Sequence, residues 1–142
     1  MNRRKVAVIG CGNVGATCAF ELIESGLFLE MVLIDVDQQR SEGEAMDLSH
    51  GSAYSHAMKI YSGNYDDIQD AGVIVITAGA AQRDGETRLD LVRKNVKIMK
   101  SIIEELKNRK CEGILLIVSN PVDILTYVAL KISGFEAHRV IG

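Results

Sequence analysis

Short runs of Val, Ile and Leu recur along this chain and alternate with segments of helical or polar pattern. A sheet with one solvated face would alternate apolar and polar side chains, whereas unbroken apolar runs indicate strands that are covered on both faces. The sequence therefore predicts an α/β fold with a parallel sheet and right-handed crossovers. Six strands are expected, at residues 5–9, 31–34, 58–61, 73–77, 113–119 and 138–141.

Helical spacing of apolar side chains predicts four helices between these strands. The expected helices lie at residues 13–26, 38–50, 87–107 and 121–132. This order of elements predicts a doubly wound parallel sheet with strand order 3-2-1-4-5-6, folded as one domain over residues 1–142. Ligands of such sheets bind beyond the carboxyl ends of the strands, beside the point where the strand order reverses.

The sequence GCGNVG at residues 10–15 directly follows the first expected strand and opens the first helix. In the G-x-G-x-x-G pattern, Gly10 permits a tight turn, Gly12 lets a pyrophosphate approach the backbone, and Gly15 lets helix and strand pack closely. The helix N-terminus then offers free N–H groups to the phosphates. Three such glycines can also form a plain turn, so the strand and helix around them carry the argument. Together they predict a dinucleotide-binding Rossmann fold.

Asp35 ends the second expected strand, 20 residues after Gly15. A carboxylate at this position accepts hydrogen bonds from an adenosine ribose and repels a 2′-phosphate, which favours NAD over NADP. The alternative is an ordinary solvated turn residue.

The segment AGAAQRDGETRL at residues 78–89 leaves the carboxyl end of the fourth strand, next to the switch point. A surface turn would need only Asp84 and Gly85. Gln82, Arg83 and Arg88 are additional polar side chains, and the position of the segment predicts a ligand-binding loop.

Charge and cysteine content exclude several classes of function. The net charge is −3 and no basic stripe is present, so nucleic acid is not an expected partner. No segment approaches membrane-spanning length. The chain has three cysteines, Cys11, Cys18 and Cys111, whose odd number and spacing fit neither a zinc site nor a disulfide framework. We therefore expect no metal, and reduced thiols in a cytoplasmic protein.

Five segments resemble L-lactate dehydrogenases of the lactate/malate dehydrogenase superfamily, from Lys5 to the end of the chain. They are GCGNVG at 10–15, LIDVD at 33–37, GEAMDLSHG at 43–51, ITAGAAQRDGETRLDL at 76–91 and VSNPVDILTYV at 118–128. The resemblance implies NAD as the cofactor. It also implies a cis peptide bond between Asn120 and Pro121.

The resemblance further implies which side chains and backbone positions contact NAD. Arg40 and Tyr65 would lie at the adenosine end, and Ser101 on the nicotinamide side. Plainer alternatives are a half-buried aromatic for Tyr65 and solvated helix residues for Arg40 and Ser101. The full implied set is Gly10, Gly12, Asn13, Val14, Gly15, Asp35, Arg40, Tyr65, Thr77, Ala78, Gly79, Ala80, Ser101, Val118, Ser119 and Asn120.

By the same resemblance, the reaction is hydride transfer between the cofactor and a small 2-oxo or 2-hydroxy acid, pyruvate or lactate. Arg88 and Asn120 would act on the ketone oxygen as catalytic residues. Gln82 would face the distal group of the substrate, where malate dehydrogenases have an arginine. Asp123 would lie behind Asn120, or would only cap the following helix. Arg83 is expected to face solvent.

The chain departs from the family pattern in two places. Family members commonly have proline where this chain has Asp84. The family's catalytic histidine, its aspartate partner and its carboxylate-binding arginine lie further along, and none of His50, His56 and His138 matches them. We therefore expect a cofactor domain without the C-terminal catalytic domain, inactive alone, from an enzyme that is a homo-oligomer, a tetramer by resemblance.

Three other functions fit parts of the sequence. A malate dehydrogenase domain shares most of the motifs, and a non-catalytic dinucleotide-binding module would need only GCGNVG and Asp35. A methyltransferase has a similar glycine loop, but the TAGAAQ and SNPVD stretches argue against it.

Overall fold

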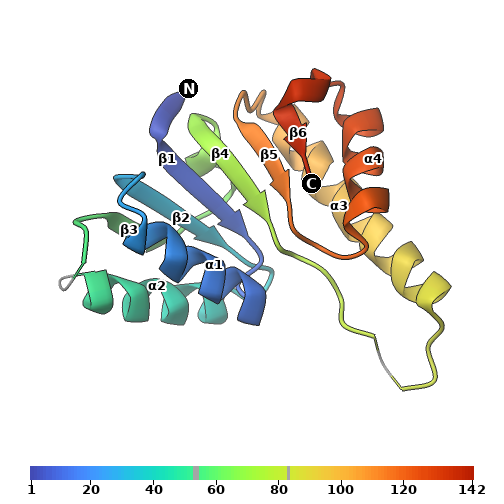
Figure 1. The fold of residues 1–142 in the computed structure, drawn as a ribbon, viewed down its shortest axis with the longest axis horizontal. Helices are drawn as coiled ribbons and strands as arrows, with labels where there is room; N and C mark the ends of the chain where they lie inside the picture. Colours follow the sequence, from blue (N-terminus) through green and yellow to red (C-terminus); the bar gives the residue numbers. More distant parts are fainter. Residues whose placement is uncertain (53–54, 83) are drawn as a thin grey trace.

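The computed structural model describes residues 1–52, 55–82 and 84–142 as a sheet with helices on both faces (Figure 1). The strands are β1 (Asn2–Ile9), β2 (Glu30–Ile34), β3 (Lys59–Ser62), β4 (Ala71–Ile76), β5 (Ile114–Ile117) and β6 (Val140–Ile141). The α-helices are α1 (Asn13–Glu24), α2 (Gln38–Ser52), α3 (Arg88–Asn108) and α4 (Val122–Ser133). Two short 3₁₀ helices, η1 (Tyr65–Ile68) and η2 (Ala137–Arg139), complete the elements.

The sheet has the expected topology. Its strands pair in parallel in the order β3-β2-β1-β4-β5-β6, which confirms the predicted doubly wound fold. None of the helices in the described part of the chain is long and apolar enough to cross a membrane.

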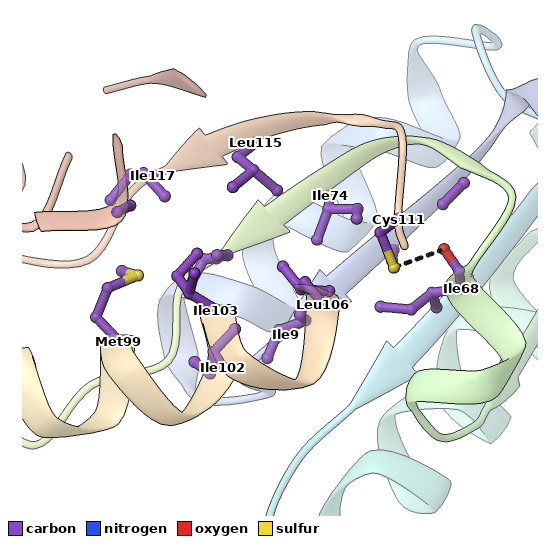
Figure 2. Packing of buried hydrophobic residues seen from close by; sticks show 14 of the residues in the cluster. Ile9, Ile68, Ile74, Met99, Ile102, Ile103, Leu106, Cys111, Leu115 and Ile117 are labelled. Carbon is purple, nitrogen blue, oxygen red and sulfur yellow. Dashed lines mark hydrogen bonds between the residues drawn. The ribbon is translucent and has the colours of Figure 1, made fainter. Parts of the chain in front are cut away.

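Alternate residues of β1 point into two separate cores, which explains why its sequence is apolar at successive positions. Val6 and Val8 pack with α1 and α2, through residues such as Ala19 and Leu48. Ala7 and Ile9 belong to the core on the other face, which α3 and α4 cover. Figure 2 shows this second core, where Met99, Ile102, Ile103 and Leu106 of α3 face Ile9, Ile74, Leu115 and Ile117 of the sheet.

Several element ends differ from the predicted ones. The helix expected from residue 87 begins at Arg88, because Thr87 and Asp90 form a capping box around its first turn. β5 ends at Ile117, earlier than predicted, and residues 118–120 form a loop. His138 was expected in the sixth strand but lies in η2, so that prediction is wrong; the strand begins only at Val140.

A charged and polar ladder, consisting of Lys5, Glu30, Lys59, Tyr61 and Asp70, joins β1, β2, β3 and the residue before β4 on the α3 side of the sheet. The Lys5 ammonium lies 2.9 Å from Asp70 Oδ1 and 3.3 Å from Glu30 Oε1, although Lys5 is only 7% exposed. The Tyr61 hydroxyl donates to the same Glu30 oxygen at 2.8 Å, and the exposed Lys59 ammonium lies 3.9 Å from it. A buried lysine is tolerated here because two carboxylates compensate its lost hydration.

These contacts shift the pKa values in the ladder. Burial alone would lower the pKa of Lys5, but its hydrogen bonds to Asp70 and Glu30 raise it above 10.5. The hydrogen bond from Tyr61, followed by that from Lys5, lowers the pKa of Glu30 below 4.5 against the effect of burial. Lys5 therefore stabilises the fold below its unfolded pKa and loses this effect as pH rises through its folded pKa. Glu30 stabilises above its unfolded pKa and loses this effect as pH falls through its folded pKa.

We predict that Lys5→Met lowers the free energy of unfolding at pH 7 by about 1–3 kcal/mol, because Glu30 and Asp70 lose their shared cation. Lys59→Met is the control: this side chain is 71% exposed, so its loss should change stability by less than about 0.5 kcal/mol. Urea unfolding followed by circular dichroism measures both. The difference between wild type and Lys5→Met should shrink below pH 4.5 and above pH 10.5. Equal effects of the two substitutions at pH 7 would contradict the ladder's role.

Candidate functional site

The carboxyl ends of four strands bring most of the predicted cofactor residues to one edge of the sheet. Ile9 is aligned with Ile34 of β2 and Ile76 of β4, and Ile76 with Ile117 of β5. The residues that follow these strands are therefore neighbours. They are Gly10, Gly12, Asn13, Val14 and Gly15 after β1, Asp35 after β2, Thr77, Ala78, Gly79 and Ala80 after β4, and Val118, Ser119 and Asn120 after β5.

The three glycines of the turn are required for different reasons. Gly10 has φ +103°, and a Cβ there would lie 2.5 Å from the Ala78 nitrogen. A Cβ on Gly15 would lie 1.8 Å from the Gly10 carbonyl oxygen. Gly12 has an ordinary φ of −71°, and a Cβ there would meet no atom within 4 Å. Packing therefore requires Gly10 and Gly15, whereas the space before Gly12 is open to a ligand.

The N-terminus of α1 is free to bind an anion. Its N-cap residue is Gly12, which makes no side-chain hydrogen bond to the helix, and its first turn holds no acidic residue. Its first N–H groups and the positive end of the helix dipole therefore remain available. In α3, by contrast, the Thr87–Asp90 capping box occupies the first turn. An uncapped helix beside an open glycine fits the phosphates of a dinucleotide.

Asp35 braces the glycine turn from the end of β2. Its Oδ2 accepts a hydrogen bond from the Cys11 N–H at 2.6 Å, and its Oδ1 accepts one from the Asp37 N–H at 2.9 Å. The residue is half-buried and is followed by the fully exposed Val36. The carboxylate is thus held beside the turn, where an adenosine ribose would meet it.

Thr77 and Ser119 use their hydroxyl groups to join neighbouring loops. Thr77 Oγ1 donates to the Gly10 carbonyl at 2.7 Å. Ser119 Oγ, on a residue only 6% exposed, donates to the Ala78 carbonyl at 2.7 Å. Both hydroxyl protons are therefore committed to the backbone, and these residues contribute to the site by fixing its loops.

Asn95 is a buried polar residue that the sequence analysis missed. It is 4% exposed on α3; its Oδ1 accepts from the Ala80 N–H and its Nδ2 donates to the Asn120 carbonyl, both at 2.8 Å. A signal was present, since Asn95 lies four residues before Met99 in the apolar stripe of the helix. The stripe predicts a buried face, and a polar residue within such a face indicates a side chain with buried hydrogen-bond partners.

The residues assigned to substrate are exposed, and the described contacts do not bring them together. Gln82 Nε2 donates to the Glu86 carbonyl at 2.8 Å within its own loop. Arg88 is the first residue of α3, and Asn120 and Asp123 are exposed at the start of α4. Figure 1 shows the described residues between β4 and α3 extending away from the sheet. Arg83 lies outside the described residues.

Two expectations near this loop and its neighbour are confirmed. Residues 84–85 form a turn with Gly85 at φ +82°. The Asn120–Pro121 peptide bond is cis.

Asp123 lies in the first turn of α4, but no side-chain hydrogen bond caps this helix. Its alternative role as a hydrogen-bonding cap is therefore not observed.

Three predicted cofactor residues lie on α2, η1 and α3 and not in the loops that follow β1, β2, β4 and β5. Arg40 is exposed, and its N–H donates to Asp37 Oδ1 at 3.2 Å at the start of α2. Tyr65 packs against the core with Arg109 5.6 Å from its ring centre, and burial, then the Glu105 charge, raises its pKa to about 12. Ser101 is exposed, and its Oγ donates to the Ile98 carbonyl. Their contacts with NAD stay predictions.

His56 and His138 do not lie in the loops at this edge of the sheet. His56 lies against the Gly26 position, which follows α1, and His138 is 3.4 Å from Glu136 on the surface. Among the described residues, no group of three or more His, Cys, Asp or Glu side chains is placed to hold a metal ion.

The parallel sheet, the open glycine turn on an uncapped helix and the carboxylate after β2 define a dinucleotide-binding Rossmann domain. Residues 4–142 match the model of the lactate/malate dehydrogenase NAD-binding domain. The chain therefore belongs to the lactate/malate dehydrogenase family and has the NAD-binding domain of that family.

Relatives favour lactate dehydrogenase over malate dehydrogenase. An L-lactate dehydrogenase of Clostridium botulinum is 54% identical over 99% of this chain, and a probable L-lactate dehydrogenase of Schizosaccharomyces pombe is 50% identical over 97%. These matches span 44% and 42% of the relatives' lengths. The crystal structure of a minor L-lactate dehydrogenase from Enterococcus mundtii, in a ligand-bound form, superposes with a TM-score of 0.94 at 45% identity, over 96% of this chain and 44% of that one.

The different roles of the glycines can be tested in the isolated chain. Gly12→Ala should leave the free energy of unfolding within about 1 kcal/mol, since the added methyl group meets nothing. It should weaken NADH binding by at least about tenfold, because the methyl group fills the open space that the phosphates need. Gly15→Ala should instead destabilise the fold by about 1–3 kcal/mol or more. Thermal unfolding and NADH titration distinguish the two, and unchanged NADH affinity in Gly12→Ala would refute this role.

Proposed function

We propose that this chain is the NAD-binding domain of an L-lactate dehydrogenase, which transfers hydride between NADH and pyruvate. The observation that carries the proposal is the shared edge of the sheet: the open turn at Gly12, the carboxylate of Asp35 and the loop of Asn120 all face it. A cofactor bound along this edge would extend from the Asp35 side of the sheet to the Asn120 side.

The residues of this edge fit the parts of NAD. Gly12 and the first turn of α1 would hold the pyrophosphate, and Asp35 would accept hydrogen bonds from the adenosine ribose. Ala80 and Asn120 flank the proposed nicotinamide end. When bound, NAD supplies or accepts the hydride, and the protein contributes position and charge.

Arg88 and Asn120 are the proposed catalytic residues of this domain. The exposed Arg88 guanidinium has no hydrogen bond or ion pair among the described residues, so it is available to stabilise negative charge on the ketone oxygen. The Asn120 side chain would donate to the same oxygen, with Asp123 behind it. No described contact joins the two side chains, and we propose that Gln82 and Arg88 approach Asn120 when substrate binds, which would also exclude water.

The chemistry is completed by residues beyond this domain. The chain spans about 44% of the length of its curated relatives, and the proton donor to the substrate oxygen is expected in a C-terminal catalytic domain. We accordingly propose that the 142-residue chain alone binds NADH without reducing pyruvate. We also propose a homotetrameric, cytoplasmic enzyme of fermentative glycolysis; the free thiols of Cys11, Cys18 and Cys111 are consistent with that compartment.

Cofactor preference tests the role of Asp35. We predict that the chain binds NADH at least about tenfold more tightly than NADPH, because the carboxylate would oppose a 2′-phosphate. Asp35→Asn should reduce the ratio between the affinities for NADH and NADPH. Asp37→Asn is the matched control, since it removes a neighbouring exposed charge but leaves the carboxylate of Asp35 in place. Calorimetric titration measures all three proteins. Equal affinity of the unmodified chain for the two cofactors would overturn the assignment.

Substrate preference tests the role of Gln82. In the full-length enzyme, Gln82→Arg should shift preference from pyruvate toward oxaloacetate by about 10²-fold or more in the ratio of kcat/KM, about 2.7 kcal/mol. The arginine can pair with the distal carboxylate of oxaloacetate, whereas with pyruvate it would be desolvated without a partner. Arg83→Gln should have little effect. If Arg83 controlled the preference, Gln82 would not be the specificity residue, and the choice of lactate over malate would lose this support.

A further inference from the structure

The buried face of α3 has a single polar member among its described residues. That face consists of Asn95, Met99, Ile102, Ile103 and Leu106. Four of these side chains are apolar and pack against the sheet, whereas Asn95 lies at the end of the face nearest the loops after β4 and β5. Burying an amide is unfavourable unless each of its polar atoms finds a partner, so its contacts must account for its presence.

Both ends of the Asn95 amide are satisfied by backbone groups of different loops. Oδ1 accepts from the Ala80 N–H, and Nδ2 donates to the Asn120 carbonyl. Rotating the amide by 180° would set NH₂ against N–H and oxygen against oxygen, so the two partners fix its orientation. No aliphatic residue could make either bond, and an aspartate could make only the first.

The Asn95 bridge is the outermost described bond between the two loops. Closer to the sheet, the Val118 N–H donates to the Ile76 carbonyl, and Ser119 Oγ donates to Ala78. Beyond Ala80 the chain leaves the sheet, and beyond Asn120 it turns into α4. The relative position of the Ala80 and Asn120 backbones is therefore set by Asn95.

Asn95 also anchors the helix that carries Arg88. The two residues are seven positions apart, about two helical turns or roughly 10 Å along the axis, and so lie on the same side of α3. The segment 81–87 connects two points, Ala80 and α3, that Asn95 holds together.

We infer that Asn95 is a positioning residue: it fixes the backbone of Asn120 relative to the cofactor loop at Ala80, and thereby sets where the Asn120 amide meets the substrate oxygen. This inference rests on the proposed function for its catalytic consequence. The bridge itself is a property of the domain and can be tested without turnover.

Two substitutions separate the two bonds. In the full-length enzyme, Asn95→Asp keeps an acceptor for the Ala80 N–H but places a carboxylate against the Asn120 carbonyl. It should lower kcat for pyruvate by about 10–100-fold, the scale of an ångström-sized misplacement, while the Kd of NADH changes by less than about threefold. Asn95→Leu loses both bonds, and should lower kcat similarly and also raise the Kd of NADH more than Asn95→Asp does.

Met99→Ala is the control for a merely structural role. It truncates the same buried face one turn further along, where the apolar side chain makes no hydrogen bond to either loop, so it should lower the melting temperature yet leave kcat within about twofold. A kcat loss in Met99→Ala equal to that of the Asn95 variants would overturn the positioning role. An Asn95→Asp enzyme with unchanged kcat would overturn it as well.

Amide hydrogen exchange in the ¹⁵N-labelled chain tests the bridge independently of catalysis. The Ala80 N–H should be protected in the unmodified chain and in Asn95→Asp, and should exchange faster in Asn95→Leu. The Asn120 side-chain resonances should shift in both variants. Unchanged Ala80 exchange in Asn95→Leu would refute the bridge. If the full-length enzyme does not reduce pyruvate, the proposed function fails, whereas this measurement still decides whether Asn95 joins the two loops.

Discussion

The backbone of Gly10 is the point on which the cofactor edge of this domain depends, that is, the edge of the sheet where β1, β2, β4 and β5 end. Its N–H donates to the Ile34 carbonyl of β2 at 2.7 Å, and its carbonyl accepts from Thr77 Oγ1 after β4 at 2.7 Å. The Cα of Gly15 packs so closely against that carbonyl that no larger residue fits. The backbone of one residue thus joins β1 to both neighbouring strands and to α1. The direction of α1, and with it the anion-binding end of the helix, follows from this junction.

Much of this arrangement could be predicted because it depends on local patterns. Unbroken apolar runs indicated strands buried on both faces, and the two-sided packing of β1, with Val8 and Ile9 in different cores, is the physical reason. The glycine spacing likewise indicated the turn. The 3₁₀ helices η1 and η2 escaped prediction because each is too short to show a helical period. The apolar stripe of α3 indicates that Asn95 is buried, but its partners, Ala80 and Asn120, are 15 and 25 residues away in sequence, and local spacing carries no information about them.

The cofactor edge and the residues proposed to bind substrate differ in how the fold holds them. Asn95 and Ser119 are buried and bonded to backbone groups of neighbouring loops, and Asp35 is half-buried with two N–H partners. Removing such a bond leaves a buried polar group unsatisfied, which costs about 1–3 kcal/mol. Backbone geometry at the cofactor edge is therefore strongly determined, as a site must be if it is to recognise phosphates through N–H groups.

Gln82 and Arg88 lie in a segment whose described side-chain contacts are outside the core. These contacts include the exposed Gln82–Glu86 hydrogen bond and Thr87–Asp90 capping box and the part-buried Glu86–Lys94 ion pair. The exposed contacts each contribute at most about 1 kcal/mol, so we expect contacts with a bound substrate to be able to replace them. Because Gln82 takes no part in the core, we expect its replacement to leave the fold undisturbed. Under the proposed function, a change of substrate class at Gln82 then need not involve the buried residues that are proposed to hold NAD.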